Sequence, residues 1–501
     1  MSENIMILFL STVKIEEEET VISFPYRYIN KNKEIIDVNG IQTNEAAVKT
    51  VLHQLNNAKE TLSAIYMLCT ETVTKKYILD SKKLSYLDFF KNNILNFCKK
   101  HTYTPPSFEP IDYIENSTGE STFTPIFKMA NKITKSCKFN DTCVYADMTG
   151  GMRNSSMLML SIIRLLEYEG IKVKQVFYSN WLKTTGEEAK SIVNYLPLNN
   201  YPPELDADII NHKDKDNSYV NIIDDITDIY ELNNLIAGAE EFNKYGSAKI
   251  LDKYFSRKDK IYSKCLQELI RTMNRFSENI RLCRADKFEN AISNLSKKIK
   301  DFEDFKNFKD NNDVVNTSNE ILLLLLPMII EKYKVLFNND KKPKHIQRLE
   351  IIRWCTNMDF LQQALTLYVE WVPDYIVEME LLYPESIKLK NDIKDLSEDN
   401  NNTQHYIFIN AKGLLKEKES IIDYHTNNLK FGNSKSYLNY DKVIEIISTY
   451  RKIKDIRNNT NHASDCKKFI SYKDIKNLLN KSILELEEAT TKYNRRPHYV
   501  P

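Results

Sequence analysis

The order of strand-like and helix-like segments changes near residue 200, and this change constrains the fold more than any other feature of the sequence. Before it, short apolar runs such as residues 5–12, 64–70 and 142–147 alternate with segments whose apolar residues repeat at helical spacing. After about residue 225, helical spacing dominates. Strand–helix alternation is typical of a parallel sheet covered by helices. The sequence therefore predicts an α/β domain followed by an all-α region.

The domain boundaries that we predict follow this change. Residues 1–200 form the α/β domain, residues 201–225 a linker rich in Pro and Asp, and residues 226–501 the helical region. Further strands are expected at residues 20–30, 108–114 and 171–178. Helices are expected at residues 45–55, 86–99, 127–136, 152–169, 226–245, 248–254, 261–282, 288–302, 319–337, 346–371, 415–427, 441–457 and 472–493.

Composition excludes several classes of protein. Only 10 of the 501 residues are Gly, which argues against a barrel or sandwich with many tight turns. A net charge of +1 excludes a globally basic nucleic-acid coat. The eight Cys residues form no C-x-x-C pair, and the most apolar segment, residues 321–330, is too short to span a bilayer. We expect a soluble, cytoplasmic protein with no membrane contact.

The first candidate site is the segment DMTGGMRNS at residues 147–155, between an expected strand and an expected helix. Its glycines allow close backbone approach, a helix start presents N–H groups, and a guanidinium can pair with phosphate. The segment is neither a Walker A loop nor G-x-G-x-x-G, so ATP hydrolysis and classical NAD binding do not follow. The candidate ligand-binding residues are Thr149, Gly150, Gly151, Arg153, Asn154 and Ser155. The alternative is an ordinary strand–turn–helix with capping residues.

Three more polar residues are expected at the same edge of the sheet. Ser11 and Thr12 end the first strand, and Asn44 lies at the start of a helix. Ligands of parallel sheets bind outside the carboxyl ends of the strands, so these residues join the candidate ligand site. Helix capping by Asn44 and ordinary strand-end polarity are the alternatives.

The second candidate site is the segment RNNTNH at residues 457–462. Arg457 continues the apolar stripe of the helix before it, and a charged residue on a buried stripe needs a partner or a function. His462 can transfer protons near pH 7, and the guanidinium can stabilise charge on phosphoryl oxygens, which suits cleavage of a phosphodiester. Asn458 follows the Arg directly. A solvated polar turn is the alternative.

Metal ligands are not clustered, and the end of the chain is basic. No His pairs at helical spacing with a second His or a carboxylate cluster, and the nearest carboxylate group, Asp224, Asp225 and Asp228, fits helix capping better. We therefore predict no metal site. Residues 435–501 carry 14 Lys and Arg against 8 Asp and Glu, with Tyr residues among them. This pattern suits single-stranded nucleic acid, and a solvated basic helix face is the alternative.

A D-x-T-G-G-x-R loop in an α/β domain, followed by a helical region with R-x-x-x-x-H, resembles the CARF–HEPN ribonucleases that accompany type III CRISPR systems. Three further stretches are similar to this family. They are the first strand with its hydroxyl residues (7–12), QTNEAA at residues 42–47, and residues 349–371, which hold Trp, QQALTL and Glu. The resemblance extends from residue 6 to residue 493.

The resemblance implies a Rossmann-like CARF sensor domain joined to an all-α C-terminal HEPN domain. The CARF domain would bind a cyclic oligoadenylate as allosteric activator, with no other cofactor. The HEPN domain would be a metal-independent endoribonuclease that cleaves single-stranded RNA in antiviral defence and leaves 2′,3′-cyclic phosphate ends. Its site would be completed across a homodimer, with Arg457, His462 and Asn458 from each protomer.

Three alternatives stay open on the sequence alone. The CARF pocket could itself cleave the cyclic ligand as a ring nuclease. The chain could be a non-catalytic oligoadenylate-binding regulator, against which the intact Arg457 and His462 argue. It could also be a HEPN toxin with an unrelated sensor.

Overall fold

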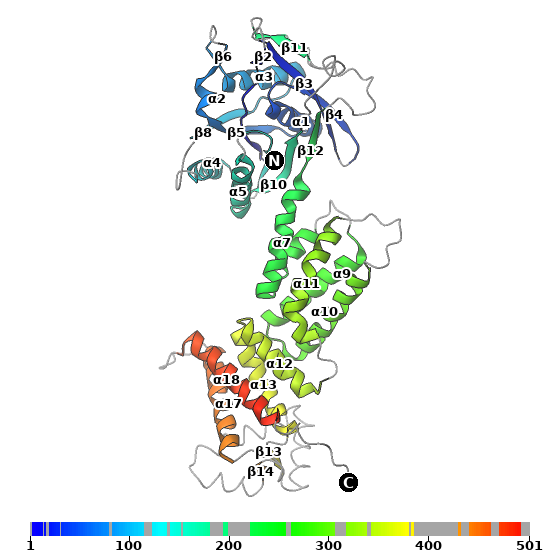
Figure 1. Cartoon of the computed structure of the whole chain (residues 1–501), viewed down its shortest axis with the longest axis vertical. Helices are drawn as coiled ribbons and strands as arrows, with labels where there is room; N and C mark the ends of the chain where they lie inside the picture. The colour runs from blue at the N-terminus through cyan, green and yellow to red at the C-terminus, as the bar shows by residue number, and fades with distance from the viewer. Residues whose placement is uncertain are drawn as a thin grey trace. The chain divides into compact units, whose positions relative to one another are not determined.

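The computed structural model divides into two compact units, residues 1–233 and residues 234–501 (Figure 1). The first holds a mixed α/β fold and the second is almost entirely helical, so the predicted fold class is confirmed. The structure describes residues 3–13, 15–16, 20–30, 32–79, 83–114, 123–137, 141–151, 154–180, 194–198, 221–256, 262–305, 317–337, 342–379, 382–384, 429–431, 440–461 and 470–491.

Ten of the described strands form one sheet in the first unit, with the order β11-β3-β12-β10-β9-β1-β5-β8, and β2 and β4 paired to β3. A separate pair, β6 and β7, forms a short hairpin-like sheet. The strands are β1 (Glu3–Phe9), β2 (Ile15–Glu16), β3 (Thr20–Ile29), β4 (Ile35–Gly40), β5 (Leu62–Thr70), β6 (Tyr77–Leu79), β7 (Leu84–Ser85), β8 (Ser107–Tyr113), β9 (Thr142–Asp147), β10 (Lys172–Ser179), β11 (Asn194–Pro197) and β12 (Asn221–Asp225).

The centre of this sheet is parallel, and its strand order reverses beside β1. The pairs β1–β5, β5–β8, β1–β9 and β9–β10 are all parallel. From β1, the chain adds β5 and β8 on one side, and then returns past β1 to add β9 and β10 on the other side. In open α/β sheets, the crevice at such a reversal, outside the carboxyl ends of the strands, is where ligands bind.

Helices cover both faces of the sheet, as the continuous burial of β1 requires. Met6 and Leu8 pack with residues of α1 and α3, whereas Ile5 and Ile7 pack with residues of α4 and α5. Because successive strand residues point to opposite faces, the apolar run at residues 5–9 of β1 supplies both cores. The helices of this unit are α1 (Thr43–Asn57), α2 (Glu71–Lys75), α3 (Tyr86–His101), α4 (Thr124–Ser136) and α5 (Ser155–Tyr168).

The predicted linker, residues 201–225, differs from the structure at its end. Residues 221–225 form β12, which pairs antiparallel with β10 and parallel with β3. Residues 201–220 lie outside the described part of the chain. Residues 35–40 were also not expected to be a strand, and they form β4 against β3. Both strands are short and polar at one end, so neither shows the apolar run that marks a buried strand.

The second unit packs its helices around one large apolar core. Helix α7 (Thr227–Tyr245) begins in the first unit and contributes Leu235 and Phe242 to this core. The other described helices are α8 (Lys249–Phe255), α9 (Lys264–Arg281), α10 (Ala285–Phe305), α11 (Thr317–Phe337), α12 (Lys344–Asn357), α13 (Leu361–Glu378), α17 (Tyr440–Asn461) and α18 (Tyr472–Thr491). Strands β13 (Leu382–Pro384) and β14 (Leu429–Phe431) pair with each other.

Helices α12, α13, α17 and α18 pack against one another as a bundle. Buried tyrosine hydroxyls join its members: Tyr450 donates to the Val369 carbonyl (3.1 Å), and Tyr375 to the Leu486 carbonyl (3.0 Å). The single helix expected at residues 346–371 is two helices here, because Asp359 adopts a left-handed conformation (φ 62°) between them. Of the described helices, none has the length and apolarity needed to cross a membrane.

Helix α17 also ends later than expected, at Asn461 rather than residue 457. The polar residues after Arg457 contain neither Gly nor Pro, so none of them breaks the helix, and within it the Thr460 hydroxyl donates to the Ile456 carbonyl (2.8 Å). Asn458 therefore lies within the last helical turns. The helix expected at residues 415–427 lies outside the described residues.

Candidate functional site

The first candidate site is built on Asp147, the last residue of β9 at the strand-order reversal. Its carboxylate accepts hydrogen bonds from the Thr149 backbone N–H (3.0 Å) and the Thr149 hydroxyl. The Thr149 oxygen in turn accepts from the backbone N–H of Ser179, at the end of β10 (2.7 Å). These bonds fix the start of the loop after β9 against the neighbouring strand.

Asn44 ties this loop to β1. Its amide nitrogen donates to Asp147 (2.7 Å), and its amide oxygen accepts from the backbone N–H (2.9 Å) and the hydroxyl (2.8 Å) of Ser11. The alternative interpretation, in which Asn44 caps α1, is wrong. The residue before the helix is Gln42, and its backbone N–H donates to the Glu45 carboxylate (3.2 Å). The polar residues after β1 and β9 and at the start of α1 are thus brought together, as predicted.

Gly150 and Gly151 let the loop lie directly on β1. A Cβ atom on Gly150 would come within 1.9 Å of the Phe9 carbonyl oxygen, and one on Gly151 within 2.6 Å of the Phe9 ring. Gly151 also has φ +93°, a conformation that side chains disfavour. Both glycines are therefore required by the close approach of the two strand ends.

Burial separates the predicted ligand residues into two groups. Asn44, Gly150 and Ser155 are buried, and the Ser155 hydroxyl donates to the Gly150 carbonyl (2.8 Å), so these residues hold the loop. The residues open to a ligand are Thr12, Gly151 and Asn154, which are exposed, with Ser11 and Thr149, which are half-buried. Asn154 donates to the Tyr113 hydroxyl (3.3 Å). Arg153 lies outside the described residues.

The buried carboxyl group of Asp147 has an unusual proton affinity. Burial raises its pKa to about 6, although the hydrogen bonds from Thr149 and Asn44 act in the opposite direction. A carboxylate kept from water favours its neutral form. Sequence reasoning placed Asp147 at the head of the motif but gave it no role, because only the fold shows that it bonds to both neighbouring segments.

The molecule repeats the same local arrangement at a second place. Asp225, the last residue of β12, accepts from the Thr227 backbone N–H (3.0 Å) and hydroxyl, and the Thr227 oxygen accepts from the Val176 N–H (2.9 Å). Of the acidic group at residues 224–228, Asp225 therefore bonds to Thr227, the first residue of α7. In both places an Asp bonds to the backbone and hydroxyl of the Thr two residues later, and we call this arrangement the D-x-T lock. The second lock lacks the following glycines of the first. The lock by itself therefore does not define a ligand site. The glycines and the strand-order reversal distinguish the first loop.

The second candidate site is centred on Arg457, near the end of α17. The stripe before it is buried, with Tyr450 and Ile453 at 1% and 0% exposure. The Arg457 guanidinium donates to the Glu370 carboxylate of α13 (3.1 Å), and both side chains remain partly exposed, at 20% and 37%. The Arg457 Nε atom is buried and has no hydrogen-bond partner in the described part of the chain. Arg457 therefore has a charged partner, as its position on a buried stripe predicted.

The rest of this site is described only in part. Asn458 is half-buried beside Arg457, and His462 lies outside the described residues. Tyr450 is buried and bonded to Val369, so it is not available to stack on RNA, contrary to the expectation for the tyrosines of the basic segment. Tyr472 is exposed. Within the described residues, no three His, Cys, Asp or Glu side chains are grouped to hold a metal ion.

The chain thus combines an α/β domain, whose polar groups gather at its strand-order reversal, with a helical region that carries a partly exposed, paired arginine. Residues 231–334, from α7 to α11, match the family model described as CRISPR-associated protein MJ1674, second domain. This part of the chain is therefore similar to a domain of a CRISPR-associated protein, which agrees with the CRISPR relationship predicted from the sequence.

A solved structure is also similar. Enterococcus italicus Csm6 bound to cyclic hexa-2′-fluoro-hexa-dAMP has 10% sequence identity and a TM-score of 0.42, and the alignment covers 99% of this chain and 96% of that chain. A TM-score of this size does not establish a common fold for the two chains. No curated protein matches the sequence.

Proposed function

We propose that this protein is a sensor–effector ribonuclease of type III CRISPR defence. A cyclic oligoadenylate binds the crevice of the α/β unit and activates cleavage of single-stranded RNA at Arg457 and His462. The observation that carries the proposal is the position of Arg457: a guanidinium on a buried helix stripe, held by Glu370 yet partly open to solvent. The CRISPR-associated domain between the two sites favours this function over a toxin with an unrelated sensor.

The crevice suits a cyclic oligonucleotide because it offers short polar groups around a close backbone approach. Thr12, in the segment after β1, and Gly151 and Asn154, in the loop between β9 and α5, are exposed. The loop leads into α5, whose N-terminus favours phosphate, and Arg153 would add a charge-assisted bond. Such a bond contributes roughly 1.5–3 kcal/mol, so Arg153→Ala should weaken binding about tenfold or more in calorimetry. An unchanged affinity would remove Arg153 from the site.

The proposed reaction needs no metal, because the substrate supplies its own nucleophile. The 2′-hydroxyl of RNA attacks the adjacent phosphorus, and the bond to the 5′-oxygen of the next nucleotide breaks. His462 serves the proton transfers between these oxygens, and Arg457 stabilises the charge of the phosphorane. Asn458, in the same helical turn as Arg457, positions these groups. The products carry a 2′,3′-cyclic phosphate and a 5′-hydroxyl.

A homodimer completes the proposed site. One R-x-x-x-x-H segment offers one guanidinium and one imidazole, and two copies facing across a two-fold axis would double both. A two-fold symmetric cyclic ligand suits the same symmetry in the α/β units. The ligand activates only if it binds the active arrangement more tightly than the inactive one.

The deciding experiment is an RNA cleavage assay in EDTA with cyclic tetra-adenylate and cyclic hexa-adenylate added separately. We expect one ring size to activate cleavage of RNA, and a DNA strand of the same sequence to stay intact. Loss of activity in EDTA, equal cleavage of DNA, or a fully active monomer in sedimentation would contradict the proposal. Degradation of the cyclic ligand that depends on the 149–153 loop and not on His462 would favour the ring nuclease instead.

A further inference from the structure

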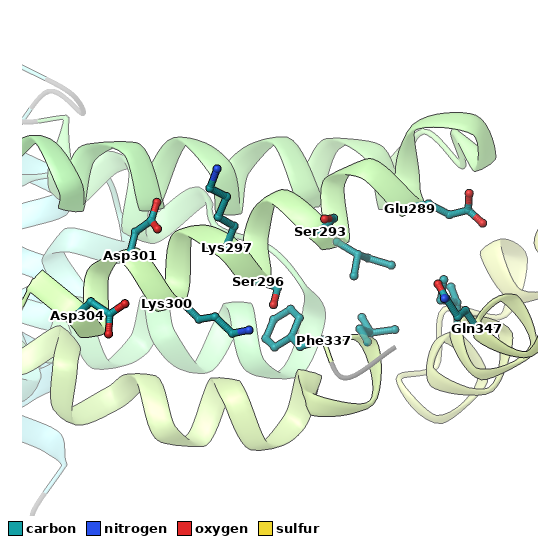
Figure 2. A pocket seen from close by; sticks show the side chains of 12 residues that line it. Glu289, Ser293, Ser296, Lys297, Lys300, Asp301, Asp304, Phe337 and Gln347 are labelled. Atoms are coloured by element: carbon teal, nitrogen blue, oxygen red, sulfur yellow. The ribbon is translucent and has the colours of Figure 1, made fainter. Parts of the chain in front are cut away.

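The helical unit contains a groove that belongs to neither site described above. It lies between α10, the end of α11 and α12, has a volume of about 410 Å³, and falls partly within the CRISPR-associated domain (Figure 2). Its apolar floor is made by Ile292, Leu336 and Ile351, which are almost fully buried. A volume of this size accommodates a small ligand.

Two lysines are the cationic side chains of the groove, whose lining also holds the carboxylates of Glu289, Asp301 and Asp304. Lys297 and Lys300 line it, both are exposed, and they stand three residues apart on α10, so they project from neighbouring positions of one helix face. Neither forms an ion pair in the part of the chain that the structure describes. Figure 2 shows the Lys300 side chain lying along the groove, with its ammonium group toward Ser296 and Phe337.

The carboxylates of the groove are largely matched by cations outside it. Glu289 pairs with Arg348 (2.7 Å) and lies 3.6 Å from the Lys344 ammonium, and Asp301 pairs with Lys298 (3.1 Å). None of these three cations lines the groove. Asp304 is the remaining acidic group of the lining. The two lysines are therefore available to an anionic ligand rather than being consumed by the neighbouring acids.

An aromatic ring and amide and hydroxyl groups complete the lining. Phe337 ends α11, is half-buried, and stacks on Tyr333 (centroids 6.1 Å apart, planes at 23°), which fixes its position. Gln347 donates to the Lys342 carbonyl (2.6 Å), which orients its amide. Ser293 and Ser296 add hydroxyls. Cationic groups for a phosphate, a ring for stacking and amide groups for a base edge are the elements of single-stranded nucleic-acid binding.

We propose that this groove binds one nucleotide unit of the single-stranded RNA, with its phosphate on Lys297 and Lys300 and its base against Phe337. The choice of RNA rests on the proposed ribonuclease function. The same chemistry would also fit a free mononucleotide, so the experiment must separate the two sources.

The test measures binding of a fluorescent single-stranded RNA to the full chain, with its 2′-hydroxyls methylated so that it cannot be cut. Lys297→Gln/Lys300→Gln should weaken binding about tenfold and reduce the slope of log K against log salt by about 0.7, because the groove holds one phosphate and each neutralised phosphate of a single strand contributes about 0.7. Lys249→Gln/Lys253→Gln removes the same charge from exposed positions on α8 and should change neither quantity.

Phe337→Leu should weaken binding about tenfold without altering the salt slope, and Phe337→Tyr should keep the affinity, since stacking is retained. Equal losses in the α8 control, or no loss in either groove variant, would overturn the proposal. Full-strength binding of adenosine monophosphate that competes with the RNA only in the wild-type groove would assign the groove to free nucleotides instead. Cleavage of ordinary RNA by the wild type, measured in parallel, separates a failed groove from a failed ribonuclease.

Discussion

The two candidate sites satisfy their polar groups in opposite ways. At the loop after β9, Asp147, Thr149, Asn44 and Ser11 bond to one another, and the central groups are shielded from water. At the end of α17, Arg457 has one carboxylate partner and a buried Nε atom with none among the described residues. The first arrangement, which we call the frame, is a network of mutual hydrogen bonds. The second is a single charged side chain with hydrogen-bonding capacity to spare.

Under the proposed function, this difference suits the two sites to different tasks. A satisfied network resists rearrangement and pre-organises the few exposed groups at its rim, which lowers the entropic cost of binding a ligand. A guanidinium with spare hydrogen-bonding capacity stabilises charge that develops during a reaction. Variants in the frame should therefore damage folding and ligand affinity together, whereas variants around Arg457 should damage the rate alone.

The largest effect is expected for His462→Ala. Loss of a general acid–base is typically worth about 10²–10⁴-fold, so RNA cleavage should fall by that factor. Cyclic oligoadenylate should bind with unchanged affinity, because the crevice is built from the other unit. Gel-based cleavage rates and calorimetry on the same preparation measure both quantities. Wild-type activity in this variant would remove His462 from the mechanism.

Gly150→Ala should have the next largest effect, on the frame. The new Cβ meets a backbone oxygen at 1.9 Å, which no side-chain movement can relieve. Overpacking of this kind costs about 1–3 kcal/mol of unfolding free energy, and the displaced loop should lose most of its affinity for the cyclic ligand. Gly40→Ala, whose Cβ would lie 3.2 Å from its nearest neighbour, is the milder control in the same unit. Equal behaviour of both variants would mean that the loop is not held as tightly as described.

Much of the frame was predictable because local patterns encode it. Apolar runs of strand length that alternate with helices form a parallel sheet, in which all strands end at the same edge. Hydroxyl or amide residues that directly follow such runs are therefore expected together at that edge. Ser11, Asn44 and Thr149 were found in this way. The partners within the frame were not predictable, because Asn44 and Asp147 are 103 residues apart, and which of them bond depends on the order of the strands.

The helical unit was less predictable, for two physical reasons. Helix ends depend on single residues: Asp359 in a left-handed conformation separates α12 from α13, and nothing in the apolar spacing marks it. Partners on different helices depend on how the helices pack. The position of Arg457 predicted that it has a partner, but Glu370 is 87 residues away and is brought to it by the contact between α13 and α17. A charged residue on an apolar stripe thus predicts that a partner exists and not which residue it is.

A smaller effect separates the two D-x-T locks. Thr149→Val and Thr227→Val each remove a hydroxyl that donates to an Asp and accepts from a strand N–H. Each should cost about 1–3 kcal/mol of unfolding free energy, because a buried donor or acceptor is left unmatched. Only Thr149→Val should weaken cyclic-ligand binding, by about tenfold, since only that loop borders the crevice. Thermal melts and calorimetry of the pair test this, and an equal loss of affinity in both would mean that general loosening of the sheet is responsible.

The smallest effect should come from Glu370→Gln, which tests whether Glu370 positions the Arg457 guanidinium or only stabilises the bundle. Gln keeps an oxygen that can accept from the guanidinium but removes the charge that orients it, so the cleavage rate should fall by roughly three- to tenfold. Stability should change by less than about 1 kcal/mol, because the pair is partly exposed. Glu487→Gln is the matched control: it removes the charge from an ion pair with Arg353 that joins α12 to α18 in the same bundle, at similar exposure. If the bundle merely needs its ion pairs, both variants slow cleavage alike. If Glu370 positions the catalytic guanidinium, only its variant slows cleavage, and cyclic-ligand affinity stays unchanged in both.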